Sequence, residues 1–254
     1  ISNKKIKNII KLFEQKKYTE IEKKTDFIRD NYPNHSTLLN ILGASYIALN
    51  KHKEASKVFR KIVQLDKKNV SSLNNYGLAL KNEGNLHLAL EQFNKANLIN
   101  PSDINSLNNL GVTYKDLNQI EKSISALEKA IKLAPENFGI YNNFGNSLLK
   151  NCQYDKAIFY FKESIKINPN YAPTYNNIGA ALLEKGNYSK ANHYFHTAIK
   201  IDKRYTVALN NLGTSYNIFN QPDKAIKYFN DAIKIQKNYS EPYFNLSLTY
   251  LLKL

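Results

Sequence analysis

Residues 138–171 read FGIYNNFGNSLLKNCQYDKAIFYFKESIKINPNY, and their pattern recurs along the 254-residue chain at intervals of 34 residues. The most regular feature is a small residue in the eighth place of each interval, preceded by a bulky apolar residue. These small residues are Gly43, Gly77, Gly111, Gly145, Gly179, Gly213 and Ser247. A fixed period of this length predicts a stack of similar supersecondary units rather than a globule with one central site.

Each interval predicts a pair of helices. Apolar residues at unit positions 4, 7 and 11, such as Tyr175, Ile178 and Leu182, form one helical stripe. A second stripe follows at positions 20, 24, 27 and 28, and turn-forming residues lie between the two. The Gly at position 8 and the Ala at position 20 indicate close contact between the two helices, because Gly inside a helix costs about 1 kcal/mol relative to Ala.

We therefore expect an all-α fold, a single solenoid of helix-turn-helix units over residues 1–254. A degenerate unit at 1–35, in which Ile9 replaces the glycine, comes first. Six regular units and a partial one follow, at 36–69, 70–103, 104–137, 138–171, 172–205, 206–239 and 240–254.

The side of each first helix that faces away from the core is uncharged and rich in asparagine. A helical wheel places positions 2, 5, 6 and 9 opposite positions 4, 7, 8 and 11. None of the 24 residues in these slots of the six regular units is charged, although 22% of the chain is charged. Asparagine dominates positions 5 and 6 although it is a mediocre helix former. The candidate binding residues are Asn75, Asn109, Asn143, Asn177, Asn211 and Asn245 at position 6, Asn74, Asn108, Asn142, Asn176 and Asn210 at position 5, and Asn146 at position 9.

A row of carboxamides suits recognition of a peptide backbone. Each amide offers a carbonyl acceptor and two N–H donors, which can pair with the N–H and C=O groups of an extended segment. The expected partner is therefore a protein or peptide client held in a groove along the first helices. The alternative, in which these asparagines only bond the neighbouring unit, stays open on the sequence.

The unit resembles the tetratricopeptide repeat in its Leu-Gly at positions 7 and 8, Tyr near 11, Ala at 20, Phe at 24, Ala at 27 and Pro at 32. The resemblance implies a right-handed superhelix, with first helices on the concave side. The asparagine at position 6 is similar to the ladder in the tetratricopeptide arms of O-linked N-acetylglucosamine transferases and related fucosyl enzymes, with Ile41 departing from it. A substrate-recruiting arm of a transferase, with its catalytic domain beyond residue 254, is thus the alternative to a scaffold. The basic clamp of repeats that bind acidic C-terminal tails is absent from the groove slots.

No other motif predicts chemistry. His193 and His196 lack a third metal ligand, and no phosphate-binding loop or catalytic constellation is found, so we expect no enzyme activity, metal or cofactor in this segment. The net charge is +15, but the basic residues of the second helices alternate with acidic ones. We therefore expect no specific nucleic-acid partner, and non-specific attraction to polyanions stays open.

The remaining expectations concern location and assembly. No apolar run is long enough to span a membrane, and the single Cys152 fits a reducing compartment, which favours a cytoplasmic location. The last helix is apolar nearly all round, with Leu248, Leu251, Leu252 and Leu254. Solenoids usually end in a polar capping helix. Either the chain was cut before its natural end or this end meets a partner, including a second copy of the chain.

Overall fold

The computed structural model describes residues 2–253, which form helices joined by short turns. The chain divides into two compact units, residues 1–133 and 134–254. In both, an α-helix begins at the first residue of every 34-residue interval from Ser36 onward. The 34-residue interval of the sequence is therefore also the interval at which the helical hairpins repeat.

The first unit consists of a three-helix segment followed by three helical hairpins. Its helices are α1 Ser2–Glu14, α2 Tyr18–Glu22, α3 Thr25–Asn31, α4 Ser36–Ala48, α5 His52–Leu65, α6 Val70–Asn82, α7 Leu86–Ile99, α8 Ile104–Asp116 and α9 Ile120–Leu133. Each first helix packs on the second helix of its own repeat, as α6 does on α7, and α6 also contacts α8. Successive hairpins thus share a continuous core.

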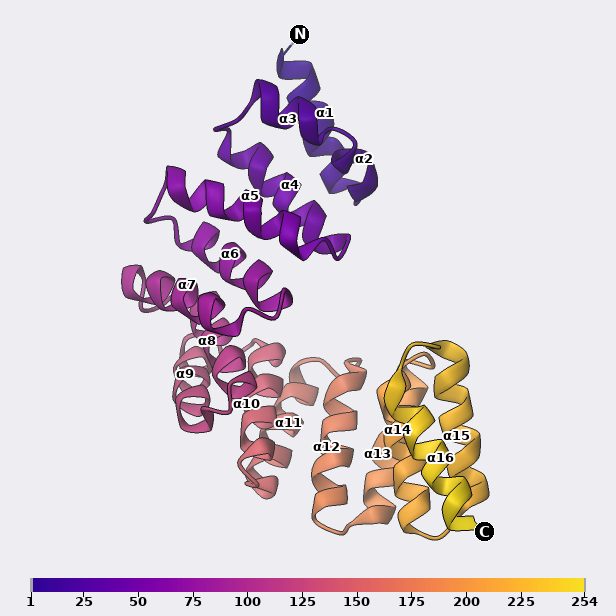
Figure 1. Cartoon of the computed structure of the whole chain (residues 1–254). Coiled ribbons are helices and arrows are strands. Elements are labelled where there is room, and N and C mark those ends of the chain that lie inside the picture. Colours follow the sequence, from indigo (N-terminus) through magenta and orange to yellow (C-terminus); the bar gives the residue numbers. More distant parts are fainter. Residues whose placement is uncertain (1, 254) are drawn as a thin grey trace. The chain divides into compact units, whose positions relative to one another are not determined.

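The second unit repeats this arrangement with three hairpins and a final single helix (Figure 1). Its helices are α10 Phe138–Lys150, α11 Tyr154–Ile167, α12 Ala172–Glu184, α13 Tyr188–Ile201, α14 Thr206–Ile218, α15 Pro222–Ile235 and α16 Ser240–Lys253. The first helices α10, α12, α14 and α16 contact one another in sequence. A row of equivalent side chains on these helices is therefore possible within this unit.

The recurring glycine makes room for a ring inside each hairpin. A Cβ placed on Gly145 would lie 2.5 Å from Cε1 of Phe161, which is fully buried at position 24 of the same unit. Carbon atoms in contact normally lie about 3.5–4.0 Å apart. The other five glycines face equivalent side chains, Phe59, Phe93, Leu127, Phe195 and Phe229. The predicted close helix contact is confirmed, and its cause is the position-24 side chain resting on the glycine backbone.

The turn between the two helices of each unit contains one residue in the left-handed conformation. It is Gly at two places, Gly84 with φ 87° and Gly186 with φ 74°. Elsewhere it is Asn three times, Lys16 once with φ 57° and Cys152 once with φ 56°. Asparagine tolerates this region better than most residues, and a residue of this kind commonly ends a helix. The turn therefore accounts for part of the asparagine content of the chain.

Residues 1–35 depart from the regular hairpin. Where the other units have one long second helix, this segment has the short helices α2 and α3, separated at Lys23 and Lys24. The glycine–phenylalanine pair is also replaced, by Ile9 and Thr25. The Thr25 hydroxyl donates to the carbonyl oxygen of Glu22 at 2.6 Å, which turns the chain at the break. The small and bulky residue types are thus exchanged at these two register positions.

Candidate functional site

The predicted groove slots meet in a hollow of the first unit. Six residues of α6 and α8 line a depression of about 330 Å³, and none is charged: Ser71, Asn74, Asn75, Leu78, Asn105 and Asn109. They occupy positions 2, 5, 6 and 9 of one repeat and positions 2 and 6 of the next. The helical wheel therefore identified side chains that share one neutral surface here.

The position-5 asparagines do not face this surface freely. Asn74, Asn142, Asn176 and Asn210 are between 4% and 7% exposed. Each lies against the following first helix and hydrogen-bonds to it or to its cap. This corrects the prediction that their amides are offered to a peptide. Burial between successive hairpins gives them a structural role, whereas Asn108 is only half-buried.

In the second unit, position 5 of one repeat accepts a hydrogen bond from position 6 of the next. The three donor–acceptor pairs, Nδ2 to Oδ1, are Asn177 to Asn142 at 3.1 Å, Asn211 to Asn176 at 2.9 Å and Asn245 to Asn210 at 3.0 Å. Asn177, Asn211 and Asn245 themselves stay half-exposed. Each position-6 amide is thus oriented by the preceding repeat while part of it remains accessible.

In the first compact unit, the position-5 residue Asn74 bonds other partners than the position-6 asparagine of the next repeat. The amide nitrogen of Asn74 donates to Oδ2 of Asp103 at 2.8 Å and to Oγ of Ser106 at 3.0 Å. Among the described residues, the side chains of Asn75 and Asn109 have no hydrogen-bond partner, and both are half-exposed in the hollow. Ile41 is buried. The accessible row of amides in this unit therefore begins at Asn75.

The remaining residues singled out from the sequence lie at or near the surface of their helices. Asn143 and Asn146 on α10 are half-exposed. His193 and His196 lie at the surface of α13. Partial loss of solvent around the His196 ring, with a smaller contribution from His193, lowers the pKa of His196. In residues 2–253 no three potential metal ligands come together.

The final helix leaves apolar side chains in solvent. Phe244 and Leu251 are each 68% exposed, and Tyr243, Leu248 and Tyr250 are also exposed. The side chain of Leu252 and the whole of Leu254 lie outside the described residues. Self-association through this end stays a prediction, which light scattering at several concentrations tests.

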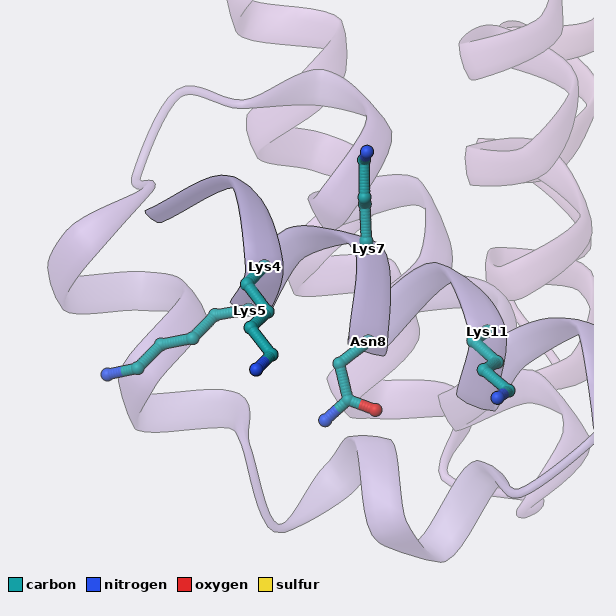
Figure 2. Close-up of a pocket in the computed structure, with 5 residues that line it drawn as sticks. All are labelled: Lys4, Lys5, Lys7, Asn8 and Lys11. Atoms are coloured by element: carbon teal, nitrogen blue, oxygen red, sulfur yellow. The ribbon is translucent and has the colours of Figure 1, made fainter. Parts of the chain in front are cut away.

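Sequence reasoning missed a lysine-lined surface on α1. Five residues line a hollow of about 530 Å³, namely Lys4, Lys5, Lys7, Asn8 and Lys11 (Figure 2). A second hollow of about 470 Å³ shares two of them and adds Ile9, Lys23, Lys24 and Phe27. The available signal was the eight lysines among the first 24 residues, against three glutamates.

These features define an all-α solenoid of hairpins with a neutral, amide-rich face on its first helices. A family model described as "Tetratricopeptide repeat" matches residues 36–69, 70–103, 104–137 and 207–239. Two further models with the same description match residues 140–171 and 160–191. The chain therefore belongs to the tetratricopeptide repeat family, and its functional class is that of a protein-interaction scaffold.

Solved structures show the same fold at low sequence identity. A tetratricopeptide repeat protein from Parabacteroides merdae is 16% identical, with a TM-score of 0.83 over 96% of this chain and 97% of the other. The APC/C hetero-tetramer Cut9–Hcn1 gives 17% identity and a TM-score of 0.78, over 95% of this chain but only 48% of that one. YrrB, described as having an unusual peptide-binding site, gives 22% identity and a TM-score of 0.52 over 74% of this chain and 97% of its own.

Neither a curated relative nor a membrane-spanning helix is found for the described part of the chain. No curated protein is similar enough to count as a relative of this chain. Within residues 2–253, every helix falls short of the length and apolar content that crossing a bilayer requires.

Proposed function

We propose that this chain holds an extended peptide segment against the position-6 asparagines of its first helices. The observation that carries the proposal is the set of inter-repeat amide pairs. A carboxamide has two N–H donors and one carbonyl acceptor, and the pair uses only one N–H. Asn211 and Asn245 thus each retain one donor and one acceptor, which is the complement of a single peptide unit. Asn177 also retains one donor, while its Oδ1 already accepts a hydrogen bond from Nδ2 of Asn176 at 3.5 Å.

The amide pairs also support the proposal through orientation. An unconstrained asparagine on a helix surface would lose side-chain freedom on binding, at about 0.5–1.5 kcal/mol for each immobilised side chain. In the second unit, the hydrogen bond to position 5 of the preceding repeat already restrains each amide. Part of the entropy loss therefore occurs during folding, and each contact to a peptide gains in net strength.

The neutral lining of the first-unit hollow favours recognition of backbone over side chains. Its residues offer amides, hydroxyl and one leucine, with no charge to select an acidic or basic residue of the client. Asn75 and Asn109 have both donors and the acceptor available there. We therefore expect clients to share an extended conformation rather than a sequence motif.

Phage display of random decapeptides would supply a probe, and fluorescence anisotropy would measure its affinity. The combined substitution Asn109→Ala, Asn143→Ala and Asn177→Ala should weaken the selected peptide at least about tenfold, since each lost hydrogen bond contributes about 0.5–1.5 kcal/mol. The far-UV spectrum should stay unchanged, and the melting temperature should fall only slightly, because Asn177→Ala also removes the hydrogen bond to Asn142. An unchanged affinity would contradict the proposal.

Two controls make the test specific. The matched variant Asn94→Ala, Asn230→Ala and Asn238→Ala removes three asparagines outside the first helices and should bind like the wild type. A peptide of the same sequence with N-methyl groups at alternate residues should lose binding, whereas a scrambled sequence should keep it. If scrambling abolished binding while N-methylation did not, recognition would be through side chains.

The proposal extends to location and leaves one rival. Cys152 is exposed and is the one cysteine of the chain, which supports a reducing compartment such as the cytoplasm. A substrate-recruiting arm of a transferase would use the same amides on a polypeptide substrate. The three-asparagine variant would then lower the rate of modification by the full-length protein.

A further inference from the structure

The hollows on α1 concentrate lysines without any carboxylate. The lysines of the two linings are Lys4, Lys5, Lys7, Lys11, Lys23 and Lys24, and neither lining contains Asp or Glu. Within the described residues none of these six forms an ion pair, although lysines elsewhere do, as Lys51 does with Glu22. We call the two hollows together, with these six lysines, the lysine hollow. No carboxylate among the described residues therefore lies within ion-pair distance of these lysines.

The lysines extend from different sides of α1 and from the break that follows α2. Figure 2 shows Lys4, Asn8 and Lys11 extending from one side of α1 and Lys7 from the other. Lys23 and Lys24 come from the break between α2 and α3, so the hollow depends on the irregular second helix of this segment. A lysine ammonium lies at the end of a flexible four-carbon side chain, so lysines on different sides of α1 can still turn toward one anionic segment.

We propose that the lysine hollow binds an acidic segment of a protein client, one that carries clustered carboxylates. The choice of a protein as the ligand rests on the proposed function of the groove. Counted in the 34-residue register, Lys7 takes position 6 of its unit, the position that Asn75 and Asn109 take later in the same compact unit. The buried Ile41 takes position 6 of the repeat between them, so a client held at Asn75 would cross α4 before it reached the hollow.

The surroundings argue against nucleic acid and membrane. Base stacking needs an accessible aromatic face, but the ring of Phe27 is covered by Nζ of Lys5 at 4.8 Å from its centroid. Binding to a lipid surface usually adds exposed apolar side chains to the basic ones. Among the described side chains of α1 to α3, no large apolar residue is exposed.

Fluorescence anisotropy with a labelled octa-glutamate peptide tests the assignment. The variant Lys4→Gln, Lys7→Gln and Lys11→Gln should bind it at least about fivefold more weakly, because three charge-assisted contacts are removed. All three side chains are exposed, so the helical spectrum should not change. An octa-glutamine peptide should not bind, and binding of octa-glutamate should weaken as salt rises.

The control removes the same charge elsewhere. Lys156→Gln, Lys162→Gln and Lys237→Gln are exposed positions of the second unit, and either triple variant lowers the net charge from +15 to +12. Octa-glutamate should bind this control within about twofold of the wild type, since screening confines charge effects to roughly 10 Å. Equal losses in both variants would overturn the proposal, because binding would then follow net charge alone.

Two competitors test the class of partner. A DNA duplex of about 20 base pairs and vesicles of phosphatidylcholine with about 30% phosphatidylserine should both bind more weakly than octa-glutamate. Tighter binding of either one, lost in the hollow variant, would overturn the assignment to an acidic protein segment. Octa-glutamate binding that survives Asn109→Ala, Asn143→Ala and Asn177→Ala supports the hollow even if the groove fails its own test.

Discussion

Replacing Gly145 by Ala tests whether the position-24 ring sets the spacing of the hairpin helices. Helix propensity alone predicts a gain of about 1 kcal/mol, because Ala is the better helix former. The structure predicts the opposite sign. The added Cβ would lie 2.5 Å and 2.6 Å from two carbons of the Phe161 ring, so the ring must move by about 1 Å or more. Since Phe161 is 0% exposed, the ring can move only by displacing the side chains that cover it.

The expected loss follows from these two opposing effects. Overpacking a closed core costs about 1–3 kcal/mol, and full burial of the ring argues for the upper end. Subtracting about 1 kcal/mol for helix propensity leaves a net destabilisation of about 2 kcal/mol. Urea unfolding followed by far-UV circular dichroism measures it. Because repeat arrays can unfold in parts, amide hydrogen exchange of α10 and α11 should show the loss locally.

Gly139 offers a matched control on the same helix α10. A Cβ there would meet only Oδ1 of Asn137, at 3.3 Å, outside the hairpin core. Gly139→Ala should therefore leave the free energy of unfolding unchanged or raise it by up to about 1 kcal/mol, the gain in helix propensity. If Gly145→Ala proved as stable as Gly139→Ala, the ring would not set the helix spacing, and the explanation for the periodic glycine would be refuted.

Three further substitutions have defined outcomes. Gly186→Ala should destabilise the chain by about 1 kcal/mol. Its φ is 74° and nothing lies within 4 Å, so the cost comes from the left-handed backbone conformation alone. A urea midpoint equal to that of the wild type would contradict this cost. Asn210→Ala should cost about 1 kcal/mol and raise hydrogen exchange in α14 and α16, because the amide of Asn245 loses its acceptor; unchanged exchange would show that water replaces the bond. Burial, and then the charge of Tyr171, raises the pKa of Tyr205 to about 12. The unfolded tyrosine ionises near pH 10, so this stabilisation is complete below pH 10 and is lost as the pH rises toward 12. Tyr205→Phe should therefore resist alkaline unfolding better than the wild type, and equal alkaline midpoints would contradict that sign.

The candidate site was only partly predictable from the chain. The helical wheel placed Asn75 and Asn109 correctly on a common neutral face, since helix geometry relates positions within one helix. It could not separate position 5 from position 6, which are adjacent in sequence and differ by the approach of the next hairpin. That approach buries Asn176 while leaving Asn177 half-exposed. The lysines of the lysine hollow were visible in the sequence, but the contribution of Lys23 and Lys24 depends on the break between α2 and α3.

The sequence alone determined the repeat, the hairpin and the neutral face, because each follows from periodicities of 34 and 3.6 residues along one chain. The tertiary structure decided which side chains are available. Packing of successive first helices turned the position-5 asparagines into inter-repeat acceptors, and packing of Phe161 on Gly145 set the helix spacing. Both depend on contacts between helices, and a residue's exposure is determined by the neighbour that covers it.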